Sequence, residues 1–187
     1  MTGIIAHRGF NGLYPENTRR SFEEALKLDI VGIECDVNLT ADGQVVVIHD
    51  LTVDRTSDGS GEVAQMPFDE LRQLNIGTEE DPQQIMLLDE LLDLLEQYPG
   101  KHILIETKHP SPFGAALEEA VADVLRGHGM EADERVHLIS FNPEAIQRFH
   151  RLLPELETFL LADDSFAPVG DCGAGPSVRL SLIHISE

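Results

Sequence analysis

Short apolar runs alternate along the chain with stretches whose apolar residues recur every three or four positions. The short runs are typical of buried strands, and the longer spacing is typical of helices that bury one face. The pattern predicts strands over residues 3–7, 31–39, 102–108, 136–141 and 157–161. It predicts helices that begin at Asn17 or Thr18, at Leu87, at Ser111 and at Asn142.

Repeated strand-then-helix units predict an α/β fold with a parallel sheet and right-handed connections. Polar residues collect where the predicted strands end, which favours a TIM (β/α) barrel, because its active sites lie on that face. A doubly wound sheet would carry a glycine-rich phosphate loop after its first strand, and Gly9 and Gly12 do not form one. The sequence therefore predicts one domain over residues 1–187.

The predicted barrel is truncated. About five barrel strands can be counted before the pattern ends at Asp163, and a complete barrel usually takes about 250 residues. Residues 45–49 form an extended segment, and residues 50–86 then form a small insertion, too poor in apolar residues to bury its own core. Residues 170–187 are rich in Gly, Ser and Pro, and we expect them to be a non-native or disordered tail.

Acidic residues stand at the ends of two predicted strands. Glu34 and Asp36 are two positions apart and therefore point to the same face of their strand. Buried carboxylates repel each other unless a cation joins them, and oxygen ligands suit Mg²⁺ or Ca²⁺. Glu106 could complete a three-carboxylate metal site, with Lys108 as a point charge for a phosphate oxygen. The alternatives are solvated strand ends and a plain ion pair between Glu106 and Lys108.

Histidines follow two of the apolar runs, at His7 and His49. Histidine titrates near neutral pH, so both are candidate catalytic residues for proton transfer. The planar guanidinium of Arg8 carries paired donors that match phosphate oxygens. Alternatively, Arg8 forms a salt bridge to a nearby acid. Glu16 and Asn17 can be explained as residues that favour the start of the following helix.

The chain carries 34 acidic against 13 basic residues, a formal net charge of −21. This field repels nucleic acid and anionic membranes, so we expect neither as a partner. No apolar stretch is long enough to span a bilayer, so stable membrane insertion is not expected. The two cysteines show no metal-ligand spacing or disulfide pattern, and no signal peptide precedes the first predicted strand. We therefore expect a cytoplasmic protein; its oligomeric state is left open.

Several short blocks, in this order and spacing, resemble the glycerophosphodiester phosphodiesterase family from residue 4 to about residue 163. The blocks are His7-Arg8-Gly9, Pro15-Glu16-Asn17-Thr18, Glu34-x-Asp36, Gly43-x-Val45-Val46-x-x-His49-Asp50 and Glu106-x-Lys108.

The resemblance implies a TIM barrel that hydrolyses glycerophosphodiesters, such as glycerophosphocholine, to glycerol 3-phosphate and an alcohol. The nucleophile would be water or the 2-hydroxyl of the substrate itself, and either histidine could be the base. Carried over residue by residue, the family's divalent cation ligands match Glu34, Asp36 and Glu106, its acid and base match His7 and His49, and its phosphate-binding residues match Arg8 and Lys108.

The C-terminal part departs from the family, whose members continue through three further strand–helix units, commonly with a tryptophan that this chain lacks. An open barrel exposes strand edges, so we expect the chain as given to aggregate readily and to have weak activity or none. Three alternatives stay open. They are a related barrel phosphodiesterase of the phospholipase C or sphingomyelinase D type, an inactive fragment with an unformed site, and a salt-adapted acidic protein with solvated carboxylates.

Overall fold

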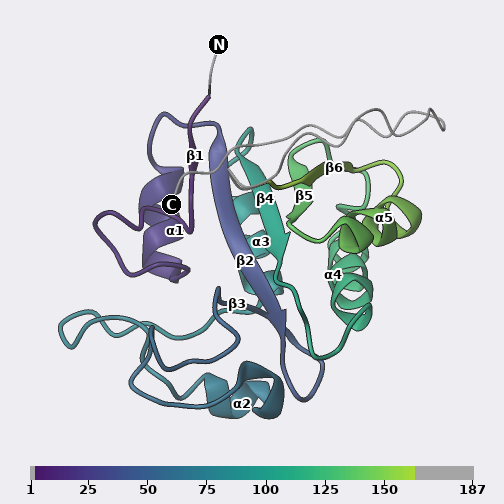
Figure 1. Cartoon of the computed structure of the whole chain (residues 1–187). Coiled ribbons are helices and arrows are strands. Elements are labelled where there is room, and N and C mark those ends of the chain that lie inside the picture. Colours follow the sequence, from purple (N-terminus) through teal and green to yellow (C-terminus); the bar gives the residue numbers. More distant parts are fainter. Residues whose placement is uncertain (1–2, 163–187) are drawn as a thin grey trace.

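This computed structural model describes residues 3–162, and five parallel strands form most of its six-stranded sheet. The strands lie in the order β1-β2-β4-β5-β6, which follows the chain (Figure 1). They match the five predicted strands, although β1 is much shorter than predicted. The tail predicted over residues 170–187 lies outside the described residues. The bounds are β1 Ile5–Ala6, β2 Gly32–Leu39, β4 His102–Thr107, β5 Val136–Ser140 and β6 Glu157–Leu160.

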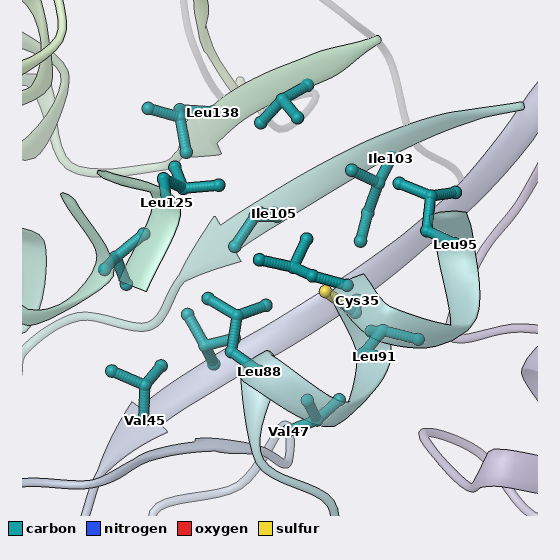
Figure 2. Close-up of a cluster of buried hydrophobic side chains, with 14 of the residues drawn as sticks. Cys35, Val45, Val47, Leu88, Leu91, Leu95, Ile103, Ile105, Leu125 and Leu138 are labelled. Carbon is teal, nitrogen blue, oxygen red and sulfur yellow. The ribbon is translucent and has the colours of Figure 1, made fainter. Parts of the chain in front are cut away.

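The helices α1, α3, α4 and α5 connect these strands and pack on one face of the sheet. Figure 2 shows this contact, where Leu88, Leu91 and Leu95 of α3 lie against Cys35 of β2 and Ile103 of β4. A doubly wound sheet would have helices on both faces, so the one-sided layer is that of a barrel wall. The bounds are α1 Arg19–Leu26, α3 Leu88–Glu96, α4 Ala116–Gly127 and α5 Pro143–Leu152.

The opposite face of the sheet carries the even-numbered side chains of β2 and β4. Leu104 of β4 packs there with Ile139 and Leu161 in a small apolar cluster. Glu34 lies opposite Leu104, and toward the carboxyl ends of the strands Asp36 and Glu106 continue this polar face; all three acids are buried. The alternation of side chains along each strand therefore separates the helix-covered core from the polar face.

The extended segment predicted before the insertion is β3, Val45–Val47, and it is not a barrel strand. It pairs antiparallel with β2 across a tight turn at Gly43, whose φ is 79°. Its alternating side chains serve two cores, because Val45 and Val47 join the main core while Val46 faces the insertion.

The insertion packs around a small apolar cluster that it shares with Val46 and Ile48, outside its own bounds. Its short elements are the 3₁₀ helix η1, Val63–Gln65, and the helix α2, Phe68–Leu71. Its apolar residues suffice because β3 contributes to the same cluster. The buried members are Val46, Ile48, Val53, Val63, Leu71, Ile76 and Ile85.

The start of α4 also differs from the prediction, which put it at Ser111. The helix begins at Ala116, and residues 112–115 form turns instead. Gly114 adopts a φ of 56°, a left-handed conformation through which a right-handed helix cannot pass. Within residues 3–162, no helix is both long enough and apolar enough to cross a membrane.

Candidate active site

Three carboxylates converge on the polar face of the sheet. Glu34 and Asp36 come from β2, and Glu106 comes from β4, with Asp36 and Glu106 directly opposite in the parallel register. One oxygen atom of each carboxylate lies within 4.8 Å of the others, and the three residues are 1%, 0% and 4% exposed. The structure therefore brings together the three acids that the sequence predicted as metal ligands.

Burial of this cluster is unfavourable for its negative charge. Burial, and then the neighbouring Asp36, raise the pKa of Glu34 well above its usual value, against the hydrogen bond from the Arg8 backbone. Burial likewise raises the pKa of Glu106, which Lys108 partly opposes. One oxygen each of Glu34 and Asp36 is buried without a hydrogen-bond partner. Crowded, buried oxygen ligands with unused lone pairs fit a hard divalent cation such as Mg²⁺ or Ca²⁺.

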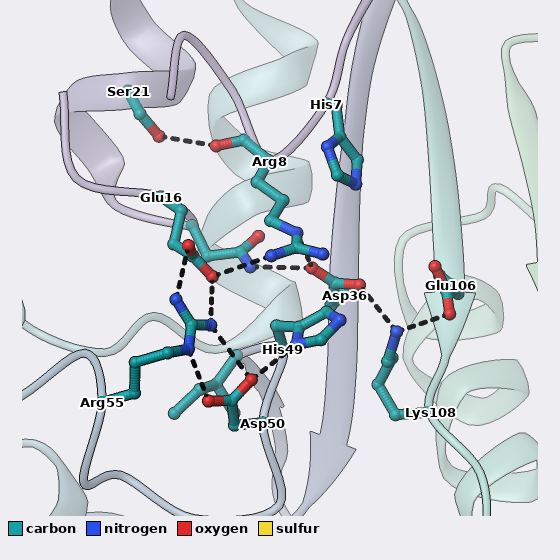
Figure 3. Close-up of polar contacts among 12 residues, drawn as sticks. His7, Arg8, Glu16, Ser21, Asp36, His49, Asp50, Arg55, Glu106 and Lys108 are labelled. Atoms are coloured by element: carbon teal, nitrogen blue, oxygen red, sulfur yellow. Dashed lines mark hydrogen bonds and ion pairs between the residues drawn. The ribbon is translucent and has the colours of Figure 1, made fainter. Parts of the chain in front are cut away.

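The two basic residues of the predicted site lie against these acids (Figure 3). Lys108 Nζ is 2.7 Å from Glu106 Oε1 and 3.4 Å from Asp36 Oδ1. Arg8 Nε lies 3.1 Å from Asp36 Oδ2, although it is not aligned to donate a hydrogen bond there. The ion pair that the sequence left as an alternative for Glu106 and Lys108 is present, and it keeps the ammonium group at the site.

Two residues near the site have a left-handed backbone, which is uncommon for residues other than glycine. Arg8 has a φ of 55°, and its backbone N–H donates a hydrogen bond of 2.9 Å to Glu34 Oε2. Asn17 has a φ of 56°, and its amide Nδ2 donates to Asp36 Oδ2 at 2.9 Å. The helix cap is Thr18, so the buried Asn17 side chain is available to orient a carboxylate. Each such conformation costs about 1–3 kcal/mol and is typical of functional sites.

Both candidate catalytic histidines line one pocket of about 370 Å³, together with Arg8, Asn11, Asp50 and Arg55. His7 Nε2 lies 3.9 Å from Glu34 Oε2. Burial, and then the Arg8 charge, lower the pKa of His7, although Asp36 opposes the shift. The His7 imidazole is therefore neutral near pH 7 and can accept a proton.

His49 is held from two sides. Its Nδ1 lies 2.6 Å from Asp50 Oδ1. Behind it, the buried amide of Asn38 donates to the backbone oxygens of Ile48 and His49, at 2.9 and 3.3 Å. Asn38 occupies the same face of β2 as Asp36, so one strand carries two of the candidate metal ligands and also contacts the backbone of a candidate catalytic histidine.

Several residues around the pocket had no role in the sequence prediction. Arg55, in the insertion, binds both Asp50 and Glu16, and Glu16 also accepts a hydrogen bond of 3.2 Å from Arg8 Nη1 (Figure 3). The sequence could have indicated Asp50, because it directly follows His49, and Glu16, because it belongs to the block Pro15-Glu16-Asn17-Thr18 that resembles the family. Arg55 lies in an irregular segment without hydrophobic periodicity, so the residues around it in the sequence do not indicate a role in the site.

Comparison with known proteins places most of this chain in one family. A model of the glycerophosphoryl diester phosphodiesterase family matches residues 7–168. A probable glycerophosphodiester phosphodiesterase 1 of Mycobacterium tuberculosis is 34% identical, and the match covers 94% of this chain and 72% of that protein. A glycerophosphodiester phosphodiesterase of Bacillus altitudinis is 38% identical, over 88% of this chain and 68% of that protein.

Solved structures show the same similarity. A glycerophosphodiester phosphodiesterase of Agrobacterium tumefaciens superposes with a TM-score of 0.75 at 32% identity, over 86% of this chain and 67% of that one. An Oleispira antarctica phosphodiesterase in complex with the product sn-glycerol-3-phosphate gives a TM-score of 0.80 at 32% identity, over 87% of this chain and 66% of that one. With its parallel sheet, its strand-end acids and these matches, the chain belongs to the glycerophosphodiester phosphodiesterase family of phosphoric diester hydrolases.

Proposed function

We propose that this protein hydrolyses glycerophosphodiesters, such as glycerophosphocholine or glycerophosphoethanolamine, to glycerol 3-phosphate and an alcohol. The observation that carries the proposal is the buried cluster of Glu34, Asp36 and Glu106 beside a pocket lined by His7 and His49. The product named for the Oleispira antarctica relative, sn-glycerol-3-phosphate, supports the same substrate class.

A divalent cation, Mg²⁺ or Ca²⁺, would be held by Glu34, Asp36 and Glu106. When bound, such an ion neutralises phosphate oxygens and stabilises the charge that develops in the transition state. Arg8 and Lys108 lie at the same carboxylates, so they can direct their N–H groups to the remaining phosphate oxygens.

His7 and His49 would carry out the proton transfers. One imidazole accepts the proton of the attacking hydroxyl, which belongs to water or to the substrate's 2-hydroxyl group. The other donates a proton to the oxygen of the departing alcohol. The hydrogen bond to Asp50 fixes the orientation of the His49 ring for this step.

The test is release of glycerol 3-phosphate from glycerophosphocholine, measured with a coupled enzyme assay in Mg²⁺, in Ca²⁺ and in EDTA. We expect weak, metal-dependent release that is lost in Glu34→Ala and in His49→Ala. Phosphatidylinositol and sphingomyelin, which release no glycerol 3-phosphate, are offered under the same conditions with phosphorus-31 NMR as the readout, to examine the phospholipase C and sphingomyelinase D alternatives. Hydrolysis of those lipids without hydrolysis of glycerophosphocholine would contradict the proposal.

A further inference from the structure

We propose that Arg55, a residue of the insertion, is a positioning residue that holds His49 and Arg8 in their working orientations through two carboxylates. This inference rests on the proposed function, because it assigns a role within that site. It also gives the insertion a function in the site, in addition to its small apolar core.

The first half of the argument concerns His49. Arg55 donates from Nε to Asp50 Oδ2 at 2.7 Å and from Nη2 to Asp50 Oδ1 at 3.0 Å. The same Oδ1 atom lies 2.6 Å from His49 Nδ1. An aspartate is ionised near neutral pH, Arg55 lowers the pKa of Asp50 further, and its two hydrogen bonds fix the direction of Oδ1, so the group facing His49 is a carboxylate that can only accept. Nδ1 must then carry the proton, and Nε2 of the neutral ring is left without one.

The second half concerns Arg8. The Nη1 and Nη2 atoms of Arg55 donate to Glu16 Oε2 and Oε1 at 2.9 and 2.8 Å. Glu16 Oε1 also accepts from Arg8 Nη1 at 3.2 Å. Arg55 therefore takes up both oxygens of Glu16, which limits how that carboxylate can turn and where it holds the Arg8 guanidinium.

A single arginine can bind Asp50 and Glu16 at the same time because its planar guanidinium has donors on two edges. One edge binds Asp50 and the other binds Glu16, as Figure 3 shows. Lysine presents one compact charge and cannot hold two carboxylates in fixed geometry. Asp50 is only five residues from Arg55, but Glu16 is 39 residues away, so the guanidinium ties the insertion to the loop after β1.

The alternative is an exposed ion network without a role in the reaction. The Arg55 side chain is 49% exposed, and exposed ion pairs add little to stability. The two possibilities therefore differ in what a substitution would change. A positioning residue affects turnover and the state of His49, whereas a plain surface network affects neither.

The test compares Arg55→Met and Arg55→Lys with the wild-type chain, using Arg126→Met as the matched control. Arg126 is 44% exposed and pairs with Asp123 on α4, away from the site. We expect kcat to fall about 10- to 100-fold in both Arg55 variants, as for other residues that orient reactive groups. The control should keep the wild-type kcat. In an Asp50→Asn background, Arg55→Met should lower kcat much less, because Arg55 acts on His49 mainly through the Asp50 carboxylate, which is already absent.

A second readout does not depend on activity. Nitrogen-15 NMR of the imidazole, assigned with His49→Ala, reports which ring nitrogen of His49 carries the proton. We expect the Nδ1–H form in the wild type and a shift toward Nε2–H in Arg55→Met and Arg55→Lys. If Arg55→Met does not fold, Arg55→Lys alone decides the outcome.

Wild-type kcat together with an unchanged His49 tautomer in the Arg55 variants would overturn the inference. The proposed function fails separately, if the wild-type chain releases no glycerol 3-phosphate. In that case the NMR comparison still decides whether Arg55 fixes the His49 ring, with a tautomer shift in support and an unchanged spectrum against.

Discussion

Asp36 and Glu106 lie directly opposite each other on the adjacent parallel strands β2 and β4, both fully or almost fully buried. Glu34 follows on the same face of β2, so three acids share a small volume. Without positive charge nearby this arrangement is unfavourable, and Arg8 and Lys108 balance only part of its negative charge. The site is therefore suited to binding a cation.

Divalent metal should stabilise the fold. Mg²⁺ or Ca²⁺ at a hundredfold excess over its Kd would add about 2.7 kcal/mol to the free energy of unfolding. Thermal unfolding followed by circular dichroism measures this effect. Glu106→Gln should lose most of the metal-induced shift, while Glu119→Gln, on the exposed side of α4, should keep it. Equal shifts in both variants would place the metal elsewhere.

Without metal, stability should fall as the pH rises above about 4.5. The pKa values of Glu34 and Glu106 are raised from 4.5 in the folded state, mainly by burial. Their stabilising contribution is present below the unfolded value and is lost as the pH rises through the folded values. Urea unfolding in EDTA at several pH values tests this. Glu34→Gln should flatten the dependence, and a dependence unchanged by that variant would contradict the assignment.

Removal of either histidine should slow the reaction without removing the metal site. For His7→Ala and for His49→Ala we expect kcat to fall about 10²- to 10⁴-fold, the usual contribution of a general acid or base. The metal-induced thermal shift should persist in both. His150→Ala, exposed on α5, is the control for a histidine outside the pocket. A variant that lost the metal shift would show that its histidine belongs to the cation site.

Two substitutions at Asn17 distinguish the effect of its left-handed backbone from the effect of its side-chain amide. Asn17→Gly keeps the left-handed backbone but removes the amide that orients Asp36. We expect near wild-type stability with metal affinity about 10- to 100-fold weaker, measured by titration calorimetry. Asn17→Ala should weaken affinity and also lower stability. If Asn17→Gly bound metal as tightly as the wild type, the amide would have no part in the site.

A buried carboxylate outside the candidate site should be important for stability alone. Glu118 of α4 is 0% exposed and lies 2.6 Å from both His109 Nε2 and Arg148 Nε. Glu118→Ala leaves Arg148, among the described residues, with only the exposed Glu144, at 3.6 Å, and should cost about 3 kcal/mol in urea unfolding. Glu119→Ala, one position along the helix and exposed, should cost little. Similar losses of stability in the two variants would show that the burial of Glu118 does not cause the effect.

The sequence predicted the strands and the acid cluster well because both depend on local rules. Alternation places Glu34 and Asp36 on one face whatever the rest of the fold. The start of α4 was wrong because Gly114 adopts a left-handed conformation, which the capping pattern at Ser111 does not show. The shared cluster of the insertion was not predicted because it depends on Val46, a residue of another element.

By itself, the sequence determined the order of strands and helices, the face on which each acid lies and the family to which the motifs belong. Periodicity and spacing carry this information, because side-chain direction along a strand or helix follows from backbone geometry alone. Only the tertiary structure decided that Asn17 orients Asp36 and that Arg55 joins Asp50 to Glu16. Hydrogen bonds between distant segments depend on how the loops pack in space, and no local pattern in a single sequence encodes that packing.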